Sequence, residues 1–209
     1  EFINGRPNDN IGITLFAGET FTQCPLTVDH AVLLDMIHNI KCGLIEDGTA
    51  VGMGIANAVT RLKDSKAKSK VIILLTDGTN NKGDISPLTA AEIAKSFGIR
   101  VYTIGVGTNG MAPYPYPVGN TVQYVNMPVE IDEKTLTQIA GTTDGNYFRA
   151  TSNSKLKEVY EEIDKLEKTK LNVKEYSKRD EEYQWFALAA FLCVLLEVLL
   201  RNSILKKIP

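Results

Sequence analysis

The sequence predicts an open, doubly wound α/β fold with a mostly parallel sheet, one antiparallel edge strand and a C-terminal transmembrane helix. Short apolar, β-branched runs alternate with stretches of helical periodicity along most of the chain, which is typical of a parallel sheet with helices on both faces. The connection Ala17–Glu19 is so short that it can join only antiparallel neighbours. Near the C-terminus, the run from Trp185 to Leu200 is apolar except for one charge.

Strands are expected where apolar residues form short runs between turn residues. These runs are Ile11–Phe16, Lys70–Thr76, Ile99–Val106 and Tyr147–Arg149, with Thr20–Gln23 after the tight connection. The run Ile11–Phe16 suits burial on both faces, so we expect it to be a central strand. Thr20–Gln23 then supplies the antiparallel strand.

Helices are expected where apolar residues recur three and four positions apart. The repeats are Leu33, Leu34, Ile37 and Ile40; Val51, Ile55, Val59 and Leu62; Ala90, Ile93, Ala94 and Phe97; Leu136 and Ile139; and Leu156, Val159, Tyr160, Ile163 and Leu166. Pro87 suits the start of the third helix, Gly98 its end, and Asp132 the cap of the fourth. Residues 1–6 resemble the last turn of a helix before a glycine, so we expect the chain to begin inside a domain.

We expect three parts: an α/β domain over residues 1–168, a juxtamembrane linker over 169–184, and a transmembrane helix with a basic tail over 185–205. A full span needs about 20 apolar residues, so the run of 16 is short, and Glu197 adds a cost. Trp185 at one end and Arg201, Lys206 and Lys207 at the other suit the two membrane interfaces. The linker pattern permits either an extended stretch or a continuous helix.

The charge balance excludes nucleic-acid binding, because 23 basic residues against 25 acidic ones form no basic patch for phosphates. The three cysteines, Cys24, Cys42 and Cys193, have neither an even count nor zinc-site spacing. Buried free thiols are therefore the simplest interpretation.

The candidate site lies where the strands end. Asp77 directly follows the Lys70–Thr76 run, and the long Pro- and Tyr-rich loop Thr108–Met127 follows the Ile99 strand. Ligands of open α/β sheets bind beyond the carboxyl ends of the strands. The hydroxyl of Thr49 precedes a helix on the same expected edge, and together with the Asp77 carboxylate it supplies oxygen ligands of the kind that Mg²⁺ prefers.

Two enzyme interpretations of these residues are excluded, because each lacks a group that its chemistry requires. A haloacid-dehalogenase-like phosphatase needs a nucleophilic carboxylate two residues before Asp77, where Leu75 stands. The glycines of Gly105–Gly110 match a dinucleotide-binding spacing, but the proline-rich segment that follows cannot form the required helix. A turn-forming role for Asp77 and a divalent-cation site remain as alternatives.

The chain resembles the von Willebrand factor A (VWA) family, and more closely the bacterial Bat aerotolerance-related proteins of the BatA type. The resemblance rests on Phe2–Arg6, Asp9–Gly12, Leu15–Gly18, Gln23–Thr27, Gly48–Gly52, Leu74–Asn81 and Ile104–Gly107. The family's metal-ion-dependent adhesion site combines an Asp-x-Ser-x-Ser segment, a threonine and an aspartate. The resemblance makes Thr49 the threonine and Asp77 the aspartate, while Asp-x-Ser-x-Ser is expected upstream of Glu1.

The resemblance implies a membrane-anchored protein-interaction module rather than an enzyme, with Mg²⁺ or another divalent cation in the intact protein and weak or no binding by this chain alone. It also implies a BatA-like role in aerotolerance, stress or envelope-complex assembly, with a MoxR-type AAA+ ATPase and related Bat proteins as partners. Tyr114 and Tyr116 are the candidate partner-binding residues on the long loop.

The competing hypothesis is a divalent-metal-dependent hydrolase of the cell envelope. It needs a base or nucleophile in the strand-end loops, whereas His30 and His38 fall on or beside the early helix. The expected location is the bacterial inner membrane. Arg201, Lys206 and Lys207 favour a periplasmic domain, although lysines on the other flank oppose that bias.

Overall fold

The computed structural model describes residues 2–41, 43, 45–107, 110–118, 121–129, 131–176 and 183–203. The chain divides after Glu167 into two compact units. The first unit, Glu1–Glu167, is the α/β domain. Its elements are η1 (Ile3–Gly5), β1 (Ile11–Phe16), β2 (Thr20–Thr27), α1 (His30–His38), α2 (Val51–Leu62), β3 (Lys70–Thr76), α3 (Pro87–Ser96), β4 (Ile99–Val106), β5 (Gly110–Val118), β6 (Thr121–Val129), α4 (Glu133–Thr142), β7 (Tyr147–Ala150) and the start of α5 (Asn153–Tyr176).

The parallel part of the sheet has the order β3-β4-β7 and runs in register. Lys70 pairs with Ile99 at one end of β3 and β4, and Thr76 pairs with Gly105 at the other. Both strands therefore end side by side at the carboxyl edge. The predicted parallel α/β arrangement is confirmed.

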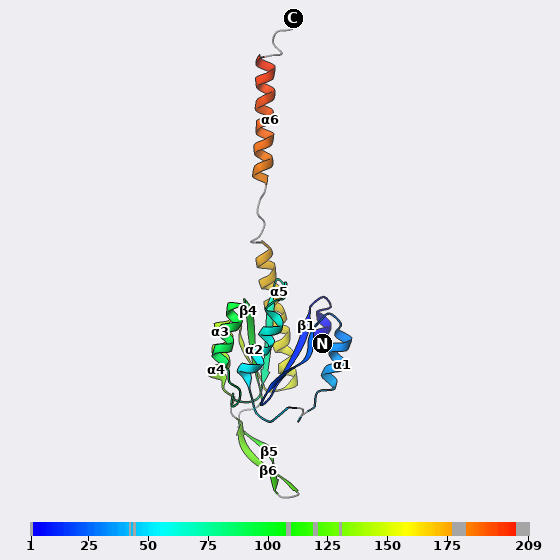
Figure 1. Ribbon diagram of the computed structural model, residues 1–209, viewed down its shortest axis with the longest axis vertical. Coiled ribbons are helices and arrows are strands. Elements are labelled where there is room, and N and C mark those ends of the chain that lie inside the picture. The colour runs from blue at the N-terminus through cyan, green and yellow to red at the C-terminus, as the bar shows by residue number, and fades with distance from the viewer. Residues whose placement is uncertain are drawn as a thin grey trace. The chain divides into compact units, whose positions relative to one another are not determined.

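Helices cover both faces of this sheet (Figure 1). Alternate residues of a strand point to opposite faces, so Ile72 and Leu74 of β3 are buried against α2, α3 and α4. Tyr102 and Ile104 of β4 belong to a second cluster with α5, whose Ile163 is almost fully buried. Burial of each such large side chain stabilises the fold by about 1.5–3 kcal/mol.

The helix boundaries follow local signals. Ser86 accepts a hydrogen bond from the Thr89 amide directly before Pro87, and Asp132 accepts one from the Thr135 amide. Hydrogen bonds from the side chain and the amide of Thr135 hold the pKa of the Asp132 carboxyl below its ordinary value. Gly98 ends α3 with φ +64, a left-handed conformation that glycine adopts without strain. Both predicted starts and the glycine stop are confirmed.

A buried carboxylate ties α5 to the opposite, amino edge of the sheet. Glu167 is 3% exposed and accepts hydrogen bonds from Arg100, from the Tyr102 hydroxyl at 2.6 Å and from the Ser69 hydroxyl at 3.0 Å. Burial raises the pKa of Glu167, but the hydrogen bonds from Tyr102 and Arg100 outweigh burial and hold it below the ordinary value. Burial, together with Glu167, raises the pKa of the Tyr102 phenol.

The predicted central position of Ile11–Phe16 is wrong for the described structure. β1 pairs only with β2, as an antiparallel two-stranded sheet, and no residue of β1 is fully buried. Among the described strands, β3 likewise pairs only with β4. The physical reason is that β1 and β3 each keep one edge without a hydrogen-bonded neighbour in this part of the chain, although α2 packs against both.

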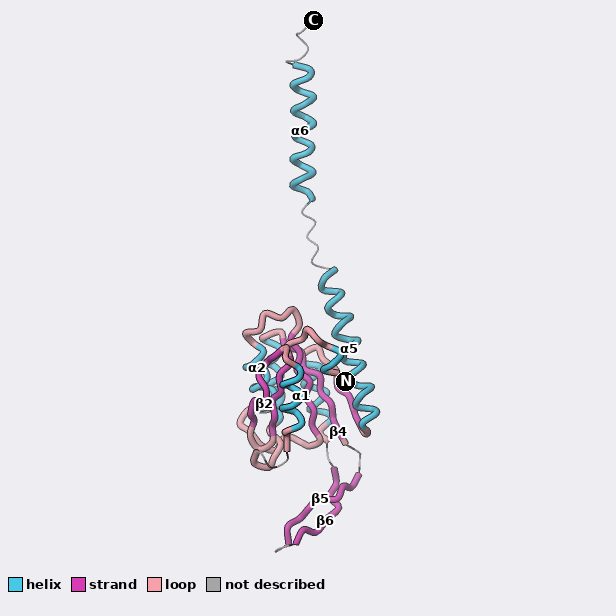
Figure 2. The backbone as a smooth tube through the Cα atoms, turned by 90° about the vertical axis from the view of Figure 1, so that its right-hand side faces the viewer, coloured by secondary structure: helices cyan, strands magenta, loops and turns pink. Residues whose placement is uncertain are grey.

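The helical turn expected before the N-terminal glycine is present as the short 3-10 helix η1, which ends at Gly5. One further prediction is corrected. Instead of an irregular loop over Thr108–Met127, β5 and β6 form a regular antiparallel hairpin (Figure 2). The physical reason is that prolines alternating with other residues keep the backbone extended and leave every second residue able to pair.

In the second unit, Lys168–Pro209, α5 continues to Tyr176 and α6 spans Tyr183–Ser203. Residues 177–182 of the predicted linker and 204–205 of the predicted tail lie outside the described residues. The helix predicted from Trp185 is confirmed as part of α6. Within the described residues, no helix is long and apolar enough to cross a membrane.

Candidate functional site

Asp77 leaves the sheet where two parallel strands end together. It follows Thr76 of β3, whose register partner is Gly105 of β4, and its side chain is exposed. The Thr76 hydroxyl lies 3.3 Å from both the amide and the carbonyl oxygen of Gly78. This contact bends the chain sharply after the strand, so Asp77 lies at the carboxyl edge as predicted.

Thr49 lies on the loop before α2, which backbone hydrogen bonds hold against the β1–β2 turn. The Ala50 amide donates to the Ala17 carbonyl at 2.7 Å, and the Gly18 amide donates to the Glu46 carbonyl at 2.7 Å. Gly48 has φ +144, and a side chain there would lie 2.6 Å from Lys82 Cγ and 3.0 Å from Gly18 Cα. Glycine is therefore required for the close approach of these segments.

Asn81 joins the Thr49 loop to the Asp77 loop. The Thr49 amide donates to Asn81 Oδ1 at 2.8 Å, and the Asn81 amide donates back to the Thr49 carbonyl at 3.0 Å. Asn80 Oδ1 lies 3.4 Å from the amide of Gly52 in the first turn of α2. Two asparagines of one loop thus fix the position of the other.

The Thr49 hydroxyl lies beside the residue that follows Asp77. A Cβ atom on Gly78 would lie 3.2 Å from Thr49 Oγ1, so the hydroxyl oxygen lies on the side of Gly78 where a side chain would be. The structure therefore brings the loops of both predicted metal-ligating residues together at one edge of the sheet.

Sequence reasoning missed Asn80 and Asn81 as positioning residues. Both stand in a run of turn formers, where asparagine is common for local reasons. Only the long-range hydrogen bonds to residues 49 and 52 reveal the role. The available signal was that Asn80-Asn81 follows in the same loop as Asp77, on the edge where Thr49 was expected.

The other predicted residues lie elsewhere. Tyr114 and Tyr116 are in β5, and their side chains lie outside the described part of the structure. On α1, His30 is half-buried and His38 is exposed, with ring nitrogens 3.0 Å and 2.6 Å from the backbone carbonyl oxygens of Asp9 and Leu34. Neither histidine contacts Thr49 or Asp77 in the hydrogen bonds described.

The cysteine prediction holds in part. Cys24 is a buried free thiol, whereas Cys193 is free but exposed on α6, so burial was wrong for Cys193. The large hydrophobic side chains beside Cys193 on α6, such as Leu192 and Val194, are exposed as well. Cys42 lies outside the described residues.

The donor set fits only part of a metal site. The Asp77 carboxylate and the Thr49 hydroxyl are hard oxygen donors on adjoining loops, which suits Mg²⁺. Within the described residues, no three or more His, Cys, Asp or Glu side chains form a group that could hold a metal ion. Two donors leave most positions of an octahedral shell to other groups.

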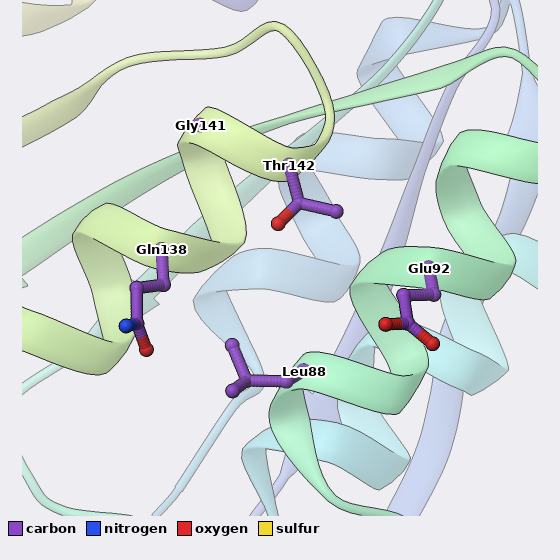
Figure 3. Close-up of a pocket in the computed structure, with 5 residues that line it drawn as sticks. All are labelled: Leu88, Glu92, Gln138, Gly141 and Thr142. Atoms are coloured by element: carbon purple, nitrogen blue, oxygen red, sulfur yellow. The ribbon is translucent and has the colours of Figure 1, made fainter.

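A separate shallow pocket lies between α3 and α4 (Figure 3). Leu88, Glu92, Gln138, Gly141 and Thr142 line it. Neither Thr49 nor Asp77 is among these residues, and Glu92 is their single carboxylate. The pocket therefore does not extend the candidate metal site.

The fold and the site define a class: an open α/β domain with ligand-bearing loops at the carboxyl edge of its strands. The family model of the von Willebrand factor type A domain matches residues 1–162. The chain belongs to this family.

Solved structures support this membership. BatB from Bacteroides thetaiotaomicron is 31% identical, with a TM-score of 0.67 over 80% of this chain and 83% of that one. An aerotolerance-related membrane protein from Bacteroides fragilis is 28% identical, with a TM-score of 0.66 over 78% and 81%. Proximal thread matrix protein 1 from the mussel byssus, with a zinc-occupied MIDAS motif, is 26% identical, with a TM-score of 0.58 over 78% and 37%.

The chain spans about half to three fifths of the length of the curated relatives that it matches. It is 26% identical over 208 residues to an uncharacterized protein of Borreliella burgdorferi. The aligned residues cover 99% of this chain and 61% of that protein. A UPF0353 protein of Nocardia farcinica is 30% identical over 182 residues, covering 78% and 53%.

Proposed function

We propose that this chain is a protein-interaction module in which Thr49 and Asp77 form part of a metal-ion-dependent adhesion site. The observation that carries the proposal is the position of Thr49 Oγ1 beside Gly78, held by the reciprocal Thr49–Asn81 hydrogen bonds. A family neighbour with a zinc-occupied MIDAS motif supports it. The module serves a BatA-like role in aerotolerance, stress or assembly of an envelope complex.

The chemistry of the site favours binding of an acidic group. A divalent cation at Thr49 and Asp77 supplies a positive charge that a partner carboxylate completes with its own oxygen. Asp77 contributes a carboxylate, and Thr49 contributes a neutral hydroxyl. A short list of protein ligands leaves the cation dependent on the partner, so binding of the metal and binding of the partner strengthen each other.

The open edges of β1 and β3 support a further donor segment. α2 packs against both strands, and each strand has one edge without a partner among the described strands. A strand that pairs with both edges would end at the carboxyl edge beside Asp77. The Asp-x-Ser-x-Ser segment of the family follows such a strand, and we propose that it supplies the remaining ligands in the longer protein.

Binding rather than hydrolysis is the function that the geometry favours. A hydrolase needs a general base within hydrogen-bond reach of the reacting group. In the described structure, His30 and His38 lie on α1 with their ring nitrogens at backbone carbonyls. We therefore propose no catalytic residue.

The apolar surface of α6 supports association with a membrane. Nine large hydrophobic residues between Leu188 and Leu200 are exposed, and together they fall on all sides of the helix. A helix that is apolar on all sides is typically buried in a protein core or in lipid. The aerotolerance-related neighbour is described as a membrane protein. The predicted inner-membrane location follows from this proposal, whereas the periplasmic side of the domain has no support in the structure and stays a prediction.

The partner proposed for this module is a MoxR-type AAA+ ATPase, together with related Bat proteins. The test is capture of a purified MoxR-type ATPase by the full chain in detergent, with Mg²⁺ or with EDTA. The matched variants are Asp77→Asn and Asp84→Asn, since Asp84 is another exposed aspartate in the same connection.

We expect Mg²⁺ to increase capture at least about ten-fold, equal to about 1.4 kcal/mol, for the wild type and for Asp84→Asn. We expect no increase for Asp77→Asn. Equal capture in EDTA, or an undiminished Mg²⁺ effect in Asp77→Asn, would contradict the proposal.

A further inference from the structure

The β5–β6 hairpin has a strict register that assigns a role to each proline. Val118 pairs with Thr121 across a two-residue connection, and pairing continues without a shift to Gly110 and Val129. In an antiparallel ladder, hydrogen-bonded pairs alternate with non-hydrogen-bonded pairs. A two-residue hairpin connection closes on a hydrogen-bonded pair, so every second pair from Val118–Thr121 onward is hydrogen-bonded.

The prolines of β5 all fall in the other set of pairs. Pro113, Pro115 and Pro117 pair with Asn126, Tyr124 and Val122. Each proline lacks the backbone N–H that an inter-strand hydrogen bond would need. In this register no hydrogen bond between β5 and β6 is lost, because the prolines occupy non-hydrogen-bonded pairs. The N–H and C=O groups of residues in this set point away from the partner strand.

The two outer edges of the hairpin therefore differ. The outer edge of β5 carries prolines at three successive outward positions, which removes its donors and blocks a further strand. The outer edge of β6 carries the outward N–H and C=O groups of Val122, Tyr124 and Asn126, and proline follows only at Pro128. The edge of β6 is the one of the two that can accept another strand.

The composition of the hairpin favours a second copy as that strand. The segment 110–129 contains no Asp, Glu, Lys or Arg, although 23% of the chain is charged. Charged residues on an edge are a common defence against edge-to-edge pairing, and β6 has none. Tyr124 is 72% exposed and Val125 is 47% exposed, so apolar surface accompanies the open edge.

We propose that two copies of this chain pair through antiparallel β6 edges centred on Tyr124, forming a four-stranded sheet in the order β5-β6-β6-β5. Tyr124 of one copy faces Tyr124 of the other, and Val122 of each faces Asn126 of the other. The outward groups of these three residues then all find partners. The absence of charge means that two identical edges approach without repulsion, and a two-fold axis closes the assembly as a dimer.

The test compares Tyr124→Pro with Tyr124→Thr in the detergent-solubilised full chain by sedimentation velocity. Proline removes the central outward donor but keeps the hairpin, since residue 124 already pairs with Pro115 in the non-hydrogen-bonded set. Threonine keeps the donor and suits a strand. We expect a dimer whose dissociation constant rises at least ten-fold in Tyr124→Pro and less than three-fold in Tyr124→Thr.

A second measurement keeps the test independent of folding in Tyr124→Pro. With Cys42 and Cys193 replaced by serine, Tyr124→Cys should form a disulfide-linked dimer on mild oxidation, because directly opposed Cα atoms about 5.5 Å apart suit a disulfide. Gln123→Cys, exposed but offset from the axis, should not. A monomeric wild type, a dimer unchanged in Tyr124→Pro, or equal cross-linking at 123 and 124 would overturn the proposal.

Discussion

The amide of Thr49 and the side chain of Asn81 are joined at 2.8 Å, and the amide of Asn81 returns a hydrogen bond to the carbonyl of Thr49 at 3.0 Å. The two residues are 32 positions apart. This reciprocal pair holds the loop before α2 against the loop after β3. It sets the distance between the Thr49 hydroxyl and the Asp77 segment, on which the proposed site depends.

Replacement of Asn81 by alanine should loosen this edge without unfolding the domain. The change removes the acceptor of the Thr49 amide, and both residues have access to water, so we expect a loss of about 1 kcal/mol in the free energy of unfolding. Urea denaturation measures this loss. Asn39→Ala, an exposed asparagine at the end of α1, is the control and should leave Mg²⁺-dependent capture of the ATPase unchanged. Unchanged capture in Asn81→Ala as well would show that the pair does not position the site.

Gly52 and Gly141 are helical glycines for which alanine should have opposite effects. A Cβ atom on Gly52 would lie 2.0 Å from the Ile85 carbonyl oxygen, whereas one on Gly141 meets nothing within 4 Å. We expect Gly52→Ala to destabilise the domain by about 2–3 kcal/mol through overpacking. Gly141→Ala should stabilise it by up to about 1 kcal/mol through helix propensity. Thermal unfolding of both variants checks the signs, and equal shifts would refute the close approach of α2 to residues 85–86.

The hydrogen bonds of Glu167 should make the free energy of unfolding depend on pH in the acid range. The folded pKa of Glu167 lies below its ordinary value of 4.5, so its contribution is complete above that unfolded value and is lost as the pH falls through the folded pKa. The unfolding free energy of the wild type should therefore decline below about pH 5. In Glu167→Gln this part of the decline should be absent.

At neutral pH, Glu167→Gln should cost about 3 kcal/mol, the lower end of the range for breaking a buried ion pair, because Arg100 keeps some contact with water. Glu158→Gln, which removes an exposed partner of Lys155, should leave the pH profile unchanged. Parallel profiles for the wild type and Glu167→Gln would contradict the assignment.

Much of the parallel sheet and its helices follows from local signals. Lys70–Thr76, Pro87 and Gly98 predict their elements because apolar runs, a helix-starting proline and a left-handed glycine act within a few residues. The position of Asp77 at the strand end follows in the same way. Thr49 was expected on the same edge because it precedes a helix there, and the family resemblance added its role as the threonine ligand.

Other features depend on partners far along the chain. The position of β1 in the sheet is set by which strands lie beside it, which Ile11–Phe16 alone does not encode. The hairpin at 110–129 was missed because prolines argue against a strand, although Pro113, Pro115 and Pro117 all occupy positions where no N–H is needed. The role of Asn81 rests on a contact 32 residues away.

The most direct test of the partial metal site is a Mn²⁺ titration of the isotopically labelled full chain, followed by paramagnetic broadening of backbone amide signals. Mn²⁺ takes the same oxygen ligands as Mg²⁺ and reports weak, local binding. With two donors, we expect a dissociation constant weaker than about 0.1 mM, with selective broadening at Thr49, Asp77 and Gly78. The broadening should vanish in Asp77→Asn and persist in Asp84→Asn. Broadening centred elsewhere, unchanged broadening in Asp77→Asn, or micromolar affinity without a partner would contradict the account.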